Sequence, residues 1–580
     1  MTFIALASTA GSGMVFAQTL PPSAGQLLQQ LAPSPPPAPP SQNNGVTPPP
    51  TPSQAPQAAS TATILLKSIS FSGNTHIDDA TLRSALPQIA QLQGQKVTSA
   101  QINTLAEAVT QYYRQRGYFI SLAYVPRQTV NAGVVTIAIL EGQLGETRIG
   151  NNGGYTAERL QRYENEALCG EASAGCAGEV LTRAQADRAV GLVSLLPGVA
   201  SASGTLAPGA KVGTSDYTLD AVAGPAVTGS VGLDNYGNVY TGRVRETGDV
   251  RWNNPLGIGD LLTGAVAASG QGLRGTDDNG ALNAVIDYSL PLGYDGWRIG
   301  ANYSRLSYRL GEPFDAIDAY GSGNAYSAYV SYPLVITPYS NLSARASYGT
   351  TWLKDSLFGE TSRPTDNAAT FGLYGNEIDT LGGGGAMQYG LALTRGRISY
   401  GSGPLPGGIP NAGGYYNKVN LNADRDQTLV YLANGTHRVS LYGAVRGQWS
   451  DTNLHPVDEM SLGGPGGVRG YPIGEASGDE GAIATMELRD SFAISALGGL
   501  NLTVSLFRDN GWLTVNKDPW PGYQGPKNRN LGSTGIGVDL LSQGRYDIKA
   551  MWALRDAGGE VDTSTKDSRS WLWLQTQVFF

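Results

Sequence analysis

One arginine set among glycines is the residue of this sequence that is best placed to do chemistry. Arg469 lies in the run Gly-Gly-Val-Arg-Gly-Tyr of residues 466–471, inside a polar stretch from about residue 450 to residue 481. The glycines of this run permit backbone turns that other residues resist. The pattern predicts a mobile loop that carries its arginine as a plug or latch. Five loop residues are candidates for this site: Gly467, Val468, Arg469, Gly470 and Tyr471.

The segments around this loop supply carboxylates that could meet the arginine. Successive side chains of a strand point to opposite faces. In residues 500–509, leucine and valine occupy one face, and Asp509 lies on the other. The same alternation in two further segments places Glu487 and Asp539 opposite the apolar side chains. Because the apolar face of a membrane strand meets lipid, all three carboxylates are predicted to point into the lumen of a barrel.

Other patterns that support chemistry are missing from the sequence. Its three histidines (His76, His437 and His455) are scattered, and H-E-x-x-H, G-x-S-x-G, C-x-x-C and Walker-type runs do not occur. Cys169 and Cys176 have no histidine nearby, which argues against zinc. In an oxidising compartment they would pair as a disulfide, and two free thiols are the alternative. We predict no enzyme activity, no cofactor and no metal.

Composition indicates which elements must position these residues. The chain of 580 residues has 15% charged residues, 78 glycines and 29 tyrosines, and it has no run of 18 apolar residues that would predict a membrane helix. Alternating strands, glycine turns and aromatic girdles give this profile in outer-membrane barrels. A secreted β-rich protein, such as a β-helix adhesin, is the alternative. The net charge of −8 argues against a nucleic-acid partner.

The C-terminal part, residues 223–580, has the pattern of such a barrel. Pro-Leu pairs at residues 255–256, 291–292 and 333–334 each end a strand-like run. Their spacing suits one hairpin of two membrane strands, which gives roughly 16 to 18 strands. An even-numbered closed barrel leaves no unpaired edge in lipid. Apolar and polar side chains alternate along the last strand up to a terminal aromatic residue, Phe580. An outer-membrane assembly machine would recognise such a strand.

Before the barrel, one order of elements occurs twice. Residues 63–143 read as strand, helix, helix, strand, strand, and residues 144–222 repeat this order. In each repeat a capping box, at residues 98–101 and 182–185, opens the second helix. Two tandem α+β modules are therefore predicted. The helix after the first box has one apolar face: Ile102, Leu105, Val109 and Tyr112.

The N-terminal region reads as a leader followed by a tethered helix. Residues 1–17 contain an apolar run and a small-residue cleavage site and are predicted to be a signal peptide, although a basic start is missing. Residues 18–62 contain a short helix-like segment, residues 24–31, followed by a proline-rich tether from Pro33 to about Pro56. A helix on a long tether can occupy a site and leave it. A disordered tail is the alternative.

These features together resemble the two-partner secretion transporters, the hemolysin secretion/activation proteins. Members of that family have a plug helix, a linker, two POTRA domains and a 16-stranded transmembrane antiparallel β-barrel. Val-Arg-Gly-Tyr at residues 468–471 is similar to the family's motif at the tip of a loop folded into the lumen. Phe-Arg-Asp-Asn-Gly at residues 507–511 is similar to its F-x-D-x-G strand motif. The resemblance implies that Arg469 pairs with Asp509 of that strand, on which the other matched residues are Phe507 and Gly511.

The resemblance also implies a location and a function. It implies a protein in the outer membrane of a Gram-negative bacterium, with its POTRA domains in the periplasm. Its partners would be one large secreted protein that crosses unfolded, the membrane lipid, and the machinery that assembles barrels. An assembly factor of the same superfamily and a passive porin or adhesin are the alternatives. We expect Arg469 to gate transport, and fixing the loop during barrel assembly is the alternative role.

Overall fold

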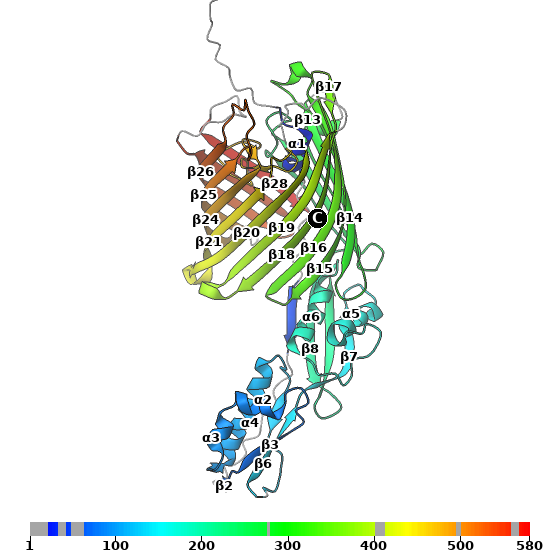
Figure 1. Cartoon of the computed structure of the whole chain (residues 1–580), viewed down its shortest axis with the longest axis vertical. Coiled ribbons are helices and arrows are strands. Elements are labelled where there is room, and N and C mark those ends of the chain that lie inside the picture. Colours follow the sequence, from blue (N-terminus) through cyan, green and yellow to red (C-terminus); the bar gives the residue numbers. More distant parts are fainter. Residues whose placement is uncertain are drawn as a thin grey trace, which may run out of the picture.

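The computed structural model describes residues 21–32, 42–47, 63–130, 132–274, 279–400, 412–494, 500–557 and 568–580. The expected signal peptide and most of the proline-rich tether lie outside these residues. Within them, a large barrel stands above two small α/β units that follow one another along the long axis (Figure 1). Among the described helices, none has both the length and the apolar composition needed to cross a membrane.

The barrel confirms the predicted fold class. In the described residues, sixteen strands follow each other in antiparallel order, and the first strand pairs with the last. A short extra strand, β17 (Glu360–Ser362), extends the end of β16. The sixteen strands are β10 (Val227–Asp234), β11 (Arg245–Asn253), β12 (Leu261–Gly270), β13 (Gly280–Pro291), β14 (Arg298–Arg309), β15 (Tyr320–Ile336), β16 (Ser340–Leu357), β18 (Pro364–Asp379), β19 (Gly385–Tyr400), β20 (Gly414–Leu432), β21 (His437–Ser450), β24 (Glu480–Ile494), β25 (Leu500–Thr514), β26 (Asn528–Ser542), β27 (Tyr546–Arg555) and β28 (Ser570–Phe579).

Side chains alternate along these strands between the outside and the lumen. On β25, Val504 and Leu506 are exposed on the outer face, whereas Phe507 and Asp509 are buried inside. One feature of the strands differs from the prediction. The Pro-Leu pair at residues 333–334 lies within β15, where the ladder with β16 shifts register between Pro333 and Val335. The residue left without a partner in this ladder is Leu334, and the disturbed ladder beside a bulge tolerates a proline, which has no N–H group.

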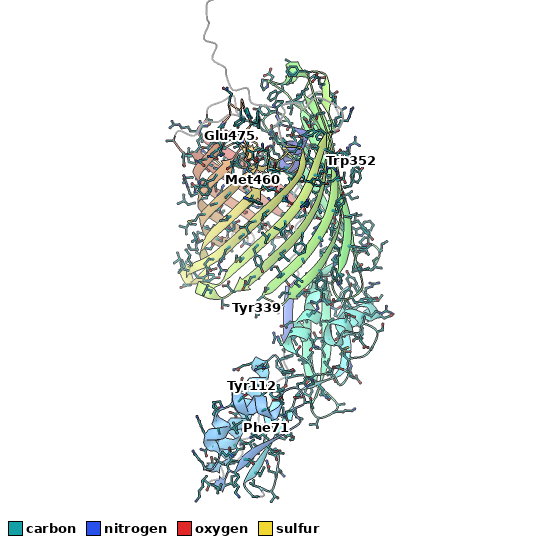
Figure 2. All side chains as sticks on the ribbon, viewed as in Figure 1. Phe71, Tyr112, Tyr339, Trp352, Met460 and Glu475 are labelled. Carbon is teal, nitrogen blue, oxygen red and sulfur yellow. A yellow bond between two sulfur atoms is a disulfide. The ribbon has the colours of Figure 1, made fainter. Side chains whose placement is uncertain are left out.

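Two segments from distant parts of the sequence fill the upper part of the lumen. Helix α1 (Ala24–Gln30) begins at a capping box of Ser23 and Gln26 and packs against β14, β15 and β16. The long loop of residues 451–479 connects β21 to β24 and contains two short paired strands, β22 (Met460–Ser461) and β23 (Ser477–Gly478). Met460 and Glu475 mark this loop inside the upper barrel (Figure 2).

The first α/β unit has its own apolar core. Its elements are β2 (Thr63–Leu65), β3 (Ser68–Ser72), α2 (Asp79–Ala85), α3 (Gln88–Leu92), β4 (Lys96–Thr98), α4 (Ser99–Gln115), β5 (Leu122–Tyr124) and β6 (Val134–Leu140). The capping box opens α4 as predicted, but Tyr113 replaces Tyr112 on its buried face. Tyr113 follows Ile102 by eleven residues, which is three turns at 3.6 residues per turn. Tyr112 instead lies beside the Arg116 guanidinium.

The second α/β unit lies between the first unit and the barrel. Its elements are β7 (Gln143–Asn152), α5 (Ala157–Cys169), α6 (Arg183–Ser194), β8 (Val199–Pro208) and β9 (Thr214–Ala223). A fourth strand, β1 (Gln42–Thr47), comes from the tether and adds in parallel to the edge strand β8 (Figure 1). Val46 of β1 is buried in the core of this unit, together with Ile336 of the barrel. The tether is therefore docked at this point.

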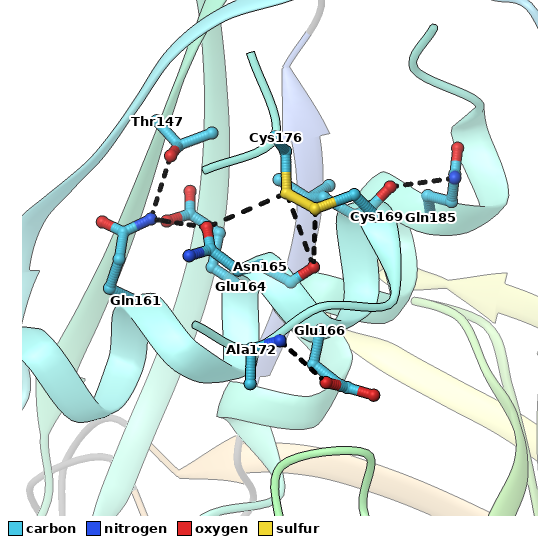
Figure 3. The surroundings of a disulfide bond; sticks show 10 residues. Thr147, Gln161, Glu164, Asn165, Glu166, Cys169, Ala172, Cys176 and Gln185 are labelled. Atoms are coloured by element: carbon cyan, nitrogen blue, oxygen red, sulfur yellow. Dashed lines mark hydrogen bonds between the residues drawn. A yellow bond between two sulfur atoms is a disulfide. The ribbon is translucent and has the colours of Figure 1, made fainter. Parts of the chain in front are cut away.

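The two cysteines lie in the second unit. Cys169 ends α5 and forms a disulfide with Cys176, with an S–S distance of 2.00 Å (Figure 3). Cys176 is buried, and both sulfur atoms lie close to the carbonyl oxygen of Asn165. The bond closes a short loop after the helix, in which Gly170 has a left-handed φ of 75°.

The barrel and the second unit are in contact at the lower rim of the barrel. Arg188 of α6 donates to the carboxylate of Asp295 at 2.7 Å and to the hydroxyl of Tyr332 at 2.9 Å. Arg162 of α5 donates to the hydroxyl of Tyr294 at 3.1 Å. Both tyrosines belong to the barrel, so these bonds fix the second unit at the lower edge of the barrel.

Candidate functional site

The tip of the lumenal loop rests against the inner wall of the barrel between β24 and β28. Val468 donates its N–H to the carbonyl of Leu462 at 2.7 Å, and Tyr471 donates to the carbonyl of Val468 at 3.2 Å. Leu462, Val468 and Tyr471 are buried in one apolar cluster with residues of the wall. The loop tip is thus a compact turn with an apolar base, which leaves Arg469 to face the strands.

Arg469 forms a two-bond ion pair with Asp509 of β25. Its Nε donates to Oδ2 at 2.9 Å and its Nη2 to Oδ1 at 2.7 Å, and its backbone N–H also donates to Oδ2 at 3.1 Å. Asp509 accepts two further bonds, from the hydroxyls of Thr485 and Ser533. Both charged side chains are buried. Such a pair is held by many directed bonds, because a buried charge is costly unless it is paired and hydrogen-bonded.

Glu487 of β24 is the second carboxylate at this arginine. It accepts from Nη1 of Arg469 at 2.6 Å and from Nε of Arg489 at 2.8 Å. Arg489 in turn reaches Asp426 of β20 at 3.1 Å. Burial lowers the pKa of the Arg469 guanidinium, but the hydrogen bonds and charges of Asp509 and Glu487 outweigh this effect and raise it. The ion pair of Arg469 is therefore one end of a line of alternating charges along the lumen wall.

The remaining motif residues shape the wall to fit the loop. The guanidinium carbon of Arg469 lies 3.3 Å from the centre of the Phe507 ring, so the cation also meets an aromatic face. A Cβ atom at Gly470 would lie 2.7 Å from Ser533 Cβ and 3.0 Å from the backbone nitrogen of Arg555. The loop can approach the wall this closely only with glycine at position 470.

The loop tip turns without left-handed backbone at its glycines. None of Gly466, Gly467 and Gly470 has a φ between +20° and +160°. Gly464 has this conformation instead, with a φ of 102°. Asp539 shares the lumenal face of β26 but lies away from Arg469. Ser533 of the same strand donates to Asp509 beside Arg469, and six residues of strand, roughly 20 Å, separate Asp539 from Ser533. Its nearest cation is Lys549, at 3.6 Å.

One residue of the site was missed by the sequence reasoning. The indole Nε1 of Trp573 on β28 donates to the backbone carbonyl of Arg469 at 2.7 Å. Trp573 is fully buried and lies on the inner face, between the outward-facing Leu572 and Leu574. Its place in the alternating pattern of the last strand was the signal that could have found it.

Comparisons with known proteins decide the family. The family described as haemolysin secretion/activation protein ShlB/FhaC/HecB matches residues 213–540, and the POTRA domain of ShlB type matches residues 64–142. The chain belongs to this family. It is a two-partner secretion transporter of the outer membrane, and such transporters act with a large secreted partner protein.

The relatives of this transporter differ in the function that their names state. It is 26% identical to the heme/hemopexin transporter protein HuxB of Haemophilus influenzae strain 86-028NP, over 82% of this chain and 80% of that protein. It is 27% identical to the outer membrane transporter CdiB of Escherichia coli O6:K15:H31, over 72% and 68%. It is 24% identical to the hemolysin transporter protein ShlB of Serratia marcescens, over 77% and 76%.

Solved structures share the fold of this transporter. CdiB from Escherichia coli superposes with a TM-score of 0.71 at 22% identity, covering 91% of this chain and 92% of that chain. CdiB from Acinetobacter baumannii superposes with a TM-score of 0.65 at 17% identity, covering 92% and 95%. The barrel, the α/β units and their order are therefore those of known transporters.

Proposed function

We propose that the ion pair of Arg469 with Asp509 and Glu487 is a clamp that keeps the export channel closed. The observation that carries this proposal is a buried, two-bond ion pair at the tip of a loop that fills the lumen. A 16-stranded barrel is wide enough to leave an aqueous channel. Here the loop and helix α1 occupy the upper part of that space, so a partner chain can pass only when they move.

The ion pair adds little net stability when it forms, but it is costly to leave half-formed. Forming a buried ion pair gives little net stability, because desolvation offsets the attraction. Removing one partner leaves a buried charge uncompensated, at a cost of about 3–5 kcal/mol. The closed state is therefore specified strongly by the pair, while the open state can let water solvate both charges. A passing chain would supply the work that separates them.

Helix α1 is the second obstacle, and we propose that it leaves the lumen during export. Ala24, Leu27 and Leu31 are buried against the barrel wall. Asp355 of β16 accepts a bond from the backbone N–H of Ala24 at 2.6 Å, and Asn283 of β13 donates to the carbonyl of Leu31 at 3.2 Å. Further bonds join Gln29 to the carbonyl of Val457 and Gln30 to Asn238 and Arg245. None of these bonds belongs to the ladder of the barrel, so a helix of seven residues can be displaced without unfolding the barrel.

We infer that residues 63–143 and 144–222 are two periplasmic POTRA domains that capture the partner. An extended chain can add a strand to the edge of a sheet through backbone hydrogen bonds. The edge strand β8 already carries β1 of the tether. We propose that the partner exchanges with β1 at this edge, which would release the tether of α1 at the moment of capture.

The cargo of this chain is proposed to be one large protein that crosses unfolded and folds outside the cell. Folding outside would prevent the chain from sliding back, so the transporter needs neither catalysis nor a cofactor. The heme/hemopexin and hemolysin transporters among its relatives define the range of cargo to test first. We also propose that outer-membrane lipid surrounds the outward-facing strands, and that the assembly machinery recognises the final strand that ends in Phe580.

A single substitution tests the clamp. In cells that express this chain with its partner, Arg469→Ala is compared with Arg508→Ala, which removes an exposed ion pair with Asp556. Barrel abundance in the outer membrane and secreted partner are measured separately. The gating role predicts normal abundance with altered secretion for Arg469→Ala and normal values for the control. Reduced abundance with normal secretion per barrel would favour the assembly role, and no change in either quantity defeats both roles.

A further inference from the structure

Helix α1 and the arginine clamp are connected by a chain of contacts that crosses the seam between the first and last barrel strands. At this seam β10 and β28 pair over five residues, whereas β10 and β11 pair over eight. Asn235 extends the seam with its side chain. Its Nδ2 donates to the carbonyl of Leu572 at 2.7 Å, and its Oδ1 accepts from the N–H of Leu574 at 2.8 Å. The backbone N–H of Asn235 also donates to the carbonyl of Leu574 at 3.1 Å, so one residue holds the upper seam with both its backbone and its side chain.

The chain of contacts begins at the end of the plug helix. Asn238 donates to the side-chain oxygen of Gln30, the last residue of α1, at 2.7 Å, and Arg245 donates to the carbonyl of Gln30 at 3.3 Å. Arg245 also forms a two-bond ion pair with Asp234, at 2.8 and 3.0 Å. Asp234 ends β10 and Arg245 begins β11. The helix thus contacts a buried charge pair at the top of the first hairpin.

The contacts then cross the seam to the clamp. Asp234 accepts a bond from the backbone N–H of Tyr236 at 2.9 Å, and the Arg245 guanidinium lies 5.8 Å from the Tyr236 ring. The Tyr236 ring meets the Trp573 ring edge to face, with centroids 5.8 Å apart and planes at 77°. Trp573 donates its indole N–H to the carbonyl of Arg469.

We propose that Trp573 is a positioning residue that couples the plug helix to the Arg469 clamp. This inference rests on the proposed clamp function. When α1 leaves, Arg245 loses its bond to Gln30, Tyr236 loses the support of that guanidinium, and Trp573 is free to release the Arg469 carbonyl. Coupling between two sites is reciprocal, so opening the clamp also loosens the plug. Export then needs no separate signal for each obstacle.

Thiol labelling of the full-length protein in lipid bilayers tests this coupling directly. The two native cysteines form a disulfide, so Gly466→Cys introduces the only free thiol, at a loop position where a Cβ atom meets nothing within 4 Å. Leu27→Asp displaces α1, because Leu27 is fully buried under the helix. We expect Leu27→Asp to speed modification of this thiol about fivefold, the factor of a lost hydrogen bond of ordinary strength.

The decisive variant is Trp573→Phe, which keeps an aromatic ring but removes the indole donor. It should speed labelling by itself, and Leu27→Asp should then add little. The control is Trp552→Phe, an outward-facing tryptophan of β27, which should leave the response to Leu27→Asp intact. Equal responses to Leu27→Asp with and without Trp573 would overturn the coupling, and so would no response in the parent chain.

A second variant and a separate readout distinguish the possible outcomes. If Trp573→Phe does not accumulate as a folded barrel, Tyr236→Leu breaks the same link while the pair of Asp234 and Arg245 remains, and the same two outcomes apply. Labelling needs no secreted partner, whereas the clamp proposal is judged by secretion from Arg469→Ala. Additive labelling with impaired secretion would refute only the coupling, and coupled labelling with normal secretion from Arg469→Ala would refute only the gating role.

Discussion

Val468 of the loop lies directly against the backbone of Gly511 on β25. A Cβ atom at position 511 would lie 2.9 Å from Cγ2 of Val468 and 3.2 Å from both terminal methyl groups of Leu462. These distances are shorter than the best separation of carbon atoms, about 3.5–4.0 Å. The glycine of the F-x-D-x-G motif is thus the surface on which the loop rests, two residues beyond the aspartate that binds Arg469.

A branched side chain at position 511 should therefore lift the loop from the wall. We expect Gly511→Val to cost roughly 1–3 kcal/mol of loop docking, the usual cost of overpacking, and to make residues 451–479 sensitive to added protease in the purified protein. The control is Gly443→Val on β21, where a Cβ atom meets nothing within 4 Å. Equal protection of the loop in both variants would show that Gly511 does not support it.

The two carboxylates of the clamp should contribute unequally. Asp509 accepts five bonds and is fully buried, whereas Glu487 accepts one bond from Arg469 and one from Arg489. We expect Asp509→Asn to weaken loop docking by about 3–5 kcal/mol, as for a broken buried pair, and Glu487→Gln by about 1 kcal/mol. Hydrogen exchange of the loop measures both. Greater deprotection in Glu487→Gln than in Asp509→Asn would reverse this ranking.

Much of the barrel and its clamp was accessible to sequence reasoning because strands alternate with a period of two. Once Leu506 was assigned to the lipid side, Asp509 had to face the lumen, and the structure has both on those sides. The contact between Arg469 and Asp509 is less local. It was expected from a resemblance of two short motifs, since no spacing rule links a loop residue to a strand residue forty positions away.

What sequence reasoning missed depends on tertiary structure. The tether segment of β1, Gln-Asn-Asn-Gly-Val-Thr, is polar and contains a glycine, so it becomes a strand only because β8 offers an open edge. The bond from Trp573 to a carbonyl and the contacts of Gln30 with Arg245 join segments that are far apart in the chain. Such contacts leave no periodic signature, because they are set by where the loop and helix dock.

Locking β1 to β8 should block export if the partner takes that edge. Thr47 and Thr205 are paired across these parallel strands, so Thr47→Cys with Thr205→Cys can form a crosslink that holds the tether in place. Undocking normally requires exposing Val46, a cost of about 1.5–3 kcal/mol, which a bound partner can offset and a covalent bond forbids. We expect secretion to fall to background when the pair is oxidised, with barrel abundance unchanged.

A matched crosslink controls for the chemistry of this experiment. Gln143→Cys with Thr214→Cys joins β7 and β9 of the same unit, whose pairing need not change during capture. This variant should secrete the partner normally under the same oxidation. Normal secretion from the oxidised Thr47 and Thr205 pair would mean that the partner does not use the β8 edge, and would leave the clamp proposal intact.

The second α/β unit should lose stability as the pH rises, because of Glu164. This side chain of α5 is fully buried, and burial raises its pKa to about 9 from an ordinary value of 4.5. Between these two values the folded state keeps the proton that the unfolded state releases. The free energy of unfolding then falls as the pH rises through this window, by at most about 1.4 kcal/mol per pH unit, and below pH 4.5 the contribution is fully present.

Hydrogen exchange of residues 157–169 in the full-length protein, corrected for the intrinsic rate at each pH, measures this effect. In the parent chain, protection should fall between pH 5.5 and pH 8. In Glu164→Gln the decline should be largely absent, and protection at pH 8 should exceed that of the parent by about tenfold or more, the factor that corresponds to one pKa unit. Glu158→Gln, an exposed carboxylate on the same helix, should behave as the parent does. An unchanged pH slope in Glu164→Gln would mean that Glu164 is ionised in the folded unit, with solvent reaching it through α5.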